Sequence, residues 1–70
     1  MVATKNLLTF EQAIEMLYVA VKRGKEIVIL AVRKIMTRFL NGKQMRVMIL
    51  SDGSHYSEES FKGVWEVKRV

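Results

Sequence analysis

The sequence predicts one small α+β domain in which an N-terminal helix packs on a small, mainly antiparallel sheet. Two patterns lead to this class. Apolar residues recur at helical spacing over residues 9–22, whereas residues 44–50 and 64–70 alternate as strands do. A chain of 70 residues has the length of one domain, residues 1–70.

The helix is predicted for residues 9–22. Thr9 is followed three residues later by Gln12, which fits a capping box, and Gly24 is a good helix stop. The apolar stripe that would face the sheet consists of Phe10, Ala13, Ile14, Leu17 and Val21.

The segment 26–41 is ambiguous between strand and helix from residue 33 onward. Residues 27–32 are apolar and rich in β-branched side chains, which favours a strand. Residues 33–40 lack a clean two-residue alternation, and their polar side chains share one helical face. Three alternatives stay open: a strand that reaches a type I′ turn at Asn41-Gly42, a short strand followed by a helix ending at Gly42, and one helix over 26–40.

Three shorter strands complete the predicted sheet. Residues 44–50 form the first, and Ser51-Asp52-Gly53 reads as a turn because Gly adopts positive φ and Asp bonds nearby amides. Residues 55–57 begin a short return strand, and residues 64–70 form the last one.

The composition favours polyanionic partners. Twelve Lys and Arg against seven Asp and Glu give a net charge of +5 and a pI near 9.9. Absent cysteine removes disulfides and thiolate metal sites, and we expect no cofactor. So small a core predicts support from a homo-oligomer. Since no apolar run approaches the length of a membrane span, we expect a cytoplasmic protein without membrane contact.

The basic residues around Gly42 form the candidate nucleic-acid-binding site. In the strand alternative, Arg46 lies across from Thr37 and beside Arg38, so that a positive patch forms on one sheet face. An ordinary solvated surface is the competing interpretation. Tyr56 is the candidate for stacking on a base. The residues predicted to contact phosphates are Arg33, Lys34, Arg38, Lys43 and Arg46.

Enzymatic chemistry finds little support in the sequence. The stretch 51–55 holds the residue types of a hydrolytic triad, but neighbours in sequence do not readily converge on one substrate atom. Asp52, His55 and Glu58 match no recognised metal-ligand spacing. We therefore expect a protein that is not an enzyme and holds no metal.

Three stretches resemble the N-terminal OB domain of the replication protein A large subunit: LTFEQAI (8–14), IVILAVRKI (27–35) and RVMILSDG (46–53). This resemblance implies a truncated OB-like sheet, with a helix followed by a meander as the alternative. It also implies a basic groove that binds acidic peptides and, weakly, single-stranded DNA. Arg33 and Arg46 match basic positions of its motifs.

A second resemblance is to small phage anti-Thoeris proteins, through TFEQAIEML, GKEI and WEV. It implies an oligomer that sequesters a defence signalling nucleotide. The leading hypothesis is a small non-enzymatic module that binds nucleic acid or an acidic protein surface. The alternative is a phage or viral regulatory protein that binds a host protein or a small signalling nucleotide.

Overall fold

The computed structural model describes residues 1–69, which form six strands and one short helix. The strands lie in one sheet in the order β1-β6-β2-β3-β4-β5, and every neighbouring pair is antiparallel. The elements are β1 (Val2–Leu8), α1 (Phe10–Ala13), β2 (Tyr18–Arg23), β3 (Glu26–Leu40), β4 (Lys43–Leu50), β5 (His55–Ser57) and β6 (Val64–Lys68).

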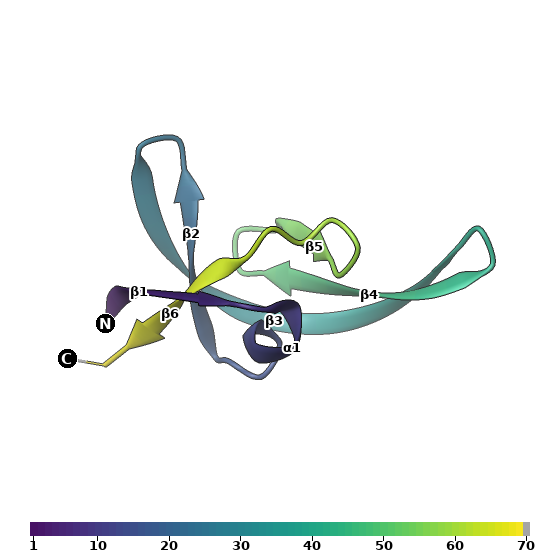
Figure 1. The fold of residues 1–70 in the computed structure, drawn as a ribbon, viewed down its shortest axis with the longest axis horizontal. Coiled ribbons are helices and arrows are strands. Elements are labelled where there is room, and N and C mark those ends of the chain that lie inside the picture. The colour runs from purple at the N-terminus through teal and green to yellow at the C-terminus, as the bar shows by residue number, and fades with distance from the viewer. Residues whose placement is uncertain (70) are drawn as a thin grey trace.

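The predicted α+β class, with a long helix packed on a sheet, is wrong. The capping box at Thr9 is present, but the helix that it starts ends after one turn at Ala13. Residues 18–23 are strand β2 instead. The fold is therefore an open antiparallel sheet, and α1 is a single helical turn between β1 and β2 (Figure 1).

Tertiary pairing overrides the helical pattern of residues 14–22. Val19 and Ala20 have no exposed surface although they point to opposite faces of β2, so both faces of this strand are covered. A helix with the predicted stripe would bury Leu17, yet 79% of Leu17 is exposed. Strand β1 was not predicted, because only Leu8 among its residues is buried and no alternation marks it.

Residues 33–40 are strand, which confirms the hairpin alternative. They belong to β3 and pair with β4 from Val32↔Leu50 to Leu40↔Lys43. Asn41 has φ 52° and Gly42 has φ 76°, as a type I′ turn requires. The predicted strands at 44–50, 55–57 and 64–70 correspond to β4, β5 and β6, although Val70 lies outside the described residues.

Strand β3 changes partner in its middle. Up to Ala31 it pairs with β2, and from Val32 it pairs with β4, with a register shift between Val32 and Lys34. At this point the Val32 N–H donates to the Leu17 carbonyl and the Ser51 N–H donates to the Ala31 carbonyl, both at 2.9 Å. Figure 1 shows β3 running from the β2–β3 turn to the far β3–β4 turn and joining the two parts of the sheet.

The core lies where α1 and the curved sheet meet. Phe10 contacts Phe61 edge to face, with ring centroids 5.3 Å apart. The buried cluster consists of Leu8, Phe10, Ala13, Val19, Val21, Met48, Leu50 and Val64.

Among residues 1–69, no helix has the length and hydropathy of a membrane span.

Two leucines test this arrangement. Leu50 is fully buried, so Leu50→Ala should lower the free energy of unfolding by about 2–5 kcal/mol through lost contacts and a residual cavity. The matched change Leu17→Ala should stay within about 0.5 kcal/mol, because Leu17 is exposed. Urea unfolding followed by circular dichroism measures both. An equal loss for the two variants would show that Leu17 is buried, as the predicted long helix requires.

Candidate nucleic-acid interface

The second half of β3 and the first half of β4 form a projecting ribbon, residues 33–46, which we call the arm (Figure 1). Exposure rises toward its tip: Val47 at its base is 4% exposed, whereas Phe39 is 76% exposed. The arm accounts for the elongated shape of the molecule, which measures 42 × 24 × 20 Å. It therefore presents its side chains to solvent on both faces.

The arm carries a charge equal to the whole net charge of the protein. It holds five Lys and Arg and no Asp or Glu, and the seven other basic residues equal the seven acidic ones in number. The net charge of +5 is therefore confined to one ribbon, and the remainder of the chain is neutral. Such confinement creates a local positive potential that net charge alone does not describe.

Three of the basic side chains share one face of the arm. Cross-strand partners lie on the same face, and the pairs Lys34↔Ile49, Met36↔Val47, Arg38↔Met45 and Leu40↔Lys43 follow one another at two-residue steps. We call the side of the arm with Lys34, Arg38 and Lys43 the basic face. Arg33 lies beside it, within the register shift of β3.

Arg46 is opposite Thr37, as predicted, but it does not share a face with Arg38. It is held by carboxylates: one guanidinium nitrogen lies 2.9 Å from Glu58 Oε2 and also contacts Glu11, and the group lies 5.5 Å from the Phe10 ring centroid. Hydrogen bonds from Arg46 lower the pKa of both carboxyl groups. Arg46 thus ties β4 to α1 and to the segment after β5.

Tyr56 also belongs to a structural network. Its ring packs against the core, and its hydroxyl accepts a 2.7 Å hydrogen bond from Arg23. The same guanidinium donates to Asp52 and Ser54, both at 3.0 Å. The Ser54 hydroxyl and N–H, followed by Arg23, lower the pKa of Asp52 to about 2. Arg23 thereby ties the end of β2 to the β4–β5 turn.

The remaining four candidates have no acidic partner within the described residues. Within residues 1–69, the ion pairs involve Arg23 and Arg46, and none involves the other arm residues. The structure therefore divides the six predicted site residues into two groups. Arg33, Lys34, Arg38 and Lys43 stand exposed on the arm, whereas Arg46 and Tyr56 hold the sheet together.

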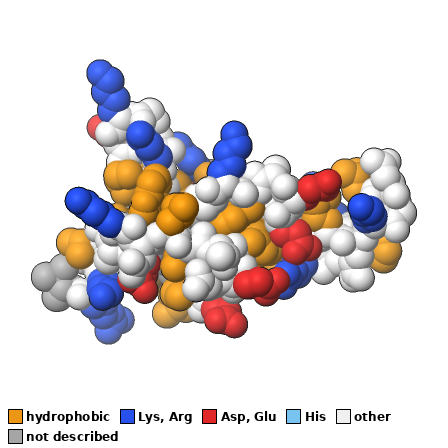
Figure 2. All heavy atoms as spheres, in the orientation of Figure 1, with side chains coloured by type: hydrophobic (Ala, Val, Ile, Leu, Met, Phe, Trp, Pro, Cys, Tyr) orange, Lys and Arg blue, Asp and Glu red, His pale blue; other side chains and the backbone are white. Residues whose placement is uncertain are grey.

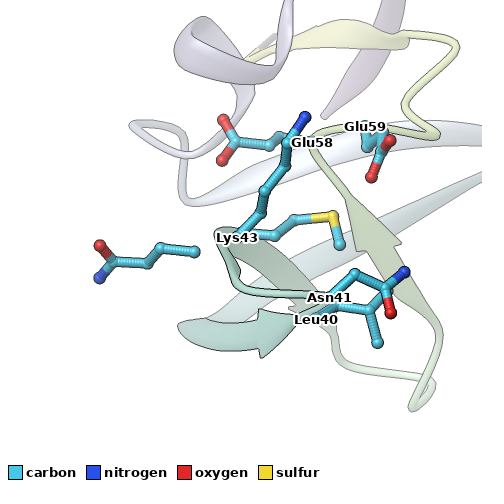
Figure 3. Close-up of a pocket in the computed structure, with 7 residues that line it drawn as sticks. Leu40, Asn41, Lys43, Glu58 and Glu59 are labelled. Carbon is cyan, nitrogen blue, oxygen red and sulfur yellow. The ribbon is translucent and has the colours of Figure 1, made fainter.

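Acidic side chains border the free edge of β4. Glu58 and Glu59 line a hollow of about 460 Å³ with Leu40, Asn41 and Lys43. Figure 3 shows Lys43 extending from the arm toward the segment that carries the two glutamates. Figure 2 shows acidic side chains gathered between the body and the arm tip on the face in view. Because Leu40, Lys43 and Met45 lie on the basic face, the two glutamates lower the positive potential of that face near Lys43.

A separate cleft of about 420 Å³ opens where β6 diverges from β2. Those two strands pair only at Val19↔Glu66 and Ala20↔Trp65, so the later part of β2 lacks β6 as a neighbour. Polar, aromatic and apolar side chains line it. The lining includes Lys22, Tyr56, Lys62, Val64 and Trp65.

The polar groups of the turn at 51–54 form hydrogen bonds with one another, which stabilise the turn. Asp52 Oδ1 accepts a hydrogen bond from the Ser54 N–H at 2.9 Å and another from the Ser54 hydroxyl. Within residues 1–69, no three His, Cys, Asp or Glu side chains are grouped so that they could hold a metal ion.

The predicted site did not include the exposed tip residue Phe39 or the structural partners Arg23 and Glu11. One signal for the arm was present in the sequence, since residues 27–51 contain no Asp or Glu. The partners of Arg46 and Tyr56 gave no signal, because they lie 12 to 35 residues away along the chain.

Comparison of the chain with protein-family models, curated proteins and solved structures gives no match. The resemblances to the replication protein A domain and to anti-Thoeris proteins therefore stay predictions.

The Arg46 network should make stability depend on pH. Lowered carboxyl pKa values stabilise the fold above the ordinary value of about 4.3, and this contribution is lost as pH falls through the lowered values. We expect Arg46→Met to lower the urea midpoint at neutral pH and to reduce its decline between about pH 5 and pH 3.

Arg38→Met is the matched control, because Arg38 takes part in none of the ion pairs of residues 1–69. It should keep both the midpoint and its pH dependence. A wild-type pH profile in the Arg46→Met variant would contradict a stabilising role for this network.

Proposed function

We propose that the protein is a non-enzymatic nucleic-acid-binding module that contacts phosphates through the arm. The observation that carries this proposal is the confinement of the whole net charge to a projecting ribbon without acidic residues. The phosphates of a nucleic acid are evenly spaced and can be approached from many directions, so exposed Lys and Arg side chains along a ribbon can contact them.

The four exposed basic residues give the arm its binding capacity. Their long side chains have no competing intramolecular ion pair among the described residues, so binding does not require that one be broken. Each phosphate that they neutralise releases condensed counterions, which favours association and makes it depend on salt. Glu58 and Glu59 lie beside Lys43, so phosphates are favoured near Arg33, Lys34 and Arg38.

Neutralising the basic face tests this function. We expect the triple change Lys34→Ala, Arg38→Ala and Lys43→Ala to weaken binding of a fluorescent duplex of about 20 base pairs, measured by anisotropy from about 50 to 200 mM salt. Because three phosphate contacts are lost, the slope of log affinity against log salt should become shallower by about 2.7. The fold should persist, since all three side chains are exposed.

A charge-matched control separates the arm from net charge. Lys5, Lys25 and Lys68 are exposed and lie outside the arm, and their replacement by alanine gives the same net charge as the arm variant. This control should retain most of the affinity and the slope. Equal losses in the two triple variants, or no binding by the wild type at low salt, would refute the arm as the interface.

The cleft beside β6 favours a second candidate function, the binding of a small nucleotide. An aromatic side chain, Trp65, and two ammonium groups, Lys22 and Lys62, line a space within the usual range of ligand pockets, about 300–1,000 Å³. Stacking would suit a base, and the lysines would suit its phosphates.

Trp65 is the single tryptophan of the chain, so its emission reports on this cleft directly. We expect saturable quenching on titration with ADP or ATP, and a dissociation constant raised about tenfold or more by Lys22→Ala with Lys62→Ala, which corresponds to at least ~1.4 kcal/mol. The pair Lys5→Ala with Lys25→Ala is the control. Linear, unsaturable quenching in the wild type would remove this candidate.

A further inference from the structure

Two large apolar side chains stand exposed at the tip of the arm. Phe39 is 76% exposed and Leu40 is 56% exposed, and both come directly before the type I′ turn at Asn41-Gly42. Basic residues flank them in sequence and across the ribbon: Arg38 comes directly before Phe39, and Lys43 pairs with Leu40. The tip therefore combines apolar surface with positive charge.

The two apolar side chains point to opposite faces of the ribbon. Phe39 pairs with Gln44 and Leu40 pairs with Lys43, and successive residues of a strand alternate between faces. Whichever face turns toward a partner, one apolar side chain lies at the leading end. The tip thus has an apolar side chain on each of its two faces and forms a narrow apolar end, not a flat apolar patch.

The shape of the arm selects among nucleic acids. Single strands are bound in basic grooves with stacking platforms, whereas the arm is convex. The major groove of A-form RNA is too deep and narrow for side chains to read. A two-stranded β-ribbon fits a groove of B-form DNA, so the charge and shape of the arm together favour duplex DNA.

We propose that Phe39 and Leu40 act as an apolar wedge that inserts between base pairs of duplex DNA and bends it, while the basic face holds the phosphates. This inference rests on the proposed nucleic-acid-binding function. Apolar side chains inserted in this way unstack base steps and kink the duplex by about 20–90°. The exposed surface at the tip is then covered by bases in the complex.

Bending is measured independently of affinity. A duplex of about 30 base pairs with a donor and an acceptor dye at its ends should give higher energy transfer when the wild type binds. The double variant Phe39→Ala, Leu40→Ala should bind the duplex with an affinity reduced less than about tenfold. The energy transfer of the DNA bound to it should equal that of free DNA. Leu17→Ala removes an equally exposed apolar side chain outside the arm and should bend DNA as the wild type does.

The outcomes separate the two proposals. Binding by the wild type without a change in energy transfer, or bending that survives in the Phe39→Ala, Leu40→Ala variant, overturns the wedge and leaves phosphate binding by the arm intact. Absence of duplex binding at low salt overturns both. Size-exclusion chromatography of the free protein provides a further check: self-association that this double change abolishes assigns the tip to a second copy of the chain and overturns the wedge.

Discussion

The whole structure depends on the exchange of partners that β3 makes at Ala31–Val32. Before this point β3 completes the part of the sheet with β2, β6 and β1, and after it β3 forms the ribbon with β4. The bonds from Val32 to Leu17 and from Ser51 to Ala31 fix both neighbours there. Val47 to Leu50 of β4 are buried on both faces of the strand, whereas Lys34 and Ile35, which pair with Ile49 and Met48, are exposed. The register at this point therefore sets where the covered part of the ribbon ends and the exposed arm begins.

Two arginine side chains link segments of the chain that the backbone hydrogen bonds of the sheet do not join. Arg23 joins the end of β2 to the β4–β5 turn, and Arg46 joins β4 to α1 and to the segment after β5. Exposed ion pairs contribute little singly, but each of these guanidinium groups holds several partners from distant parts of the chain. Their planar, multiply donating geometry suits this role better than an ammonium group would. Arg23 and Arg46 consequently serve the fold, whereas Arg33, Lys34, Arg38 and Lys43 of the arm stay exposed.

Local chemistry made part of this structure predictable. Asn41-Gly42 and Asp52-Gly53 specify turns through backbone conformations that few residues adopt, and the capping box at Thr9 specifies where α1 starts. The helix was extended too far because the spacing of Phe10, Ala13 and Leu17 fits a helix. The pairing that overrides this pattern joins β2 to its hairpin partner β3 on one side and to β6, which is distant in sequence, on the other. The candidate site followed the same rule. The cluster of basic residues around Gly42 was predicted from neighbouring residues, but the carboxylates that hold Arg46 come from α1 and from the segment after β5.

The arm owes its form to few interactions, and this bears on what it does. Among the described residues, 37–44 are all exposed, so the cross-strand ladder and the type I′ turn maintain this part of the arm. A two-stranded ribbon is marginal by itself, and such a segment opens locally more easily than the body of the sheet. Within residues 1–69, its four exposed cations form no ion pair, and the apolar side chains of Phe39 and Leu40 at its tip are exposed. A polyanion with stacked apolar faces satisfies both groups at once, because its phosphates neutralise the charge and its bases cover the apolar surface. The features that leave the free arm weakly stabilised are therefore those that a nucleic-acid complex would use.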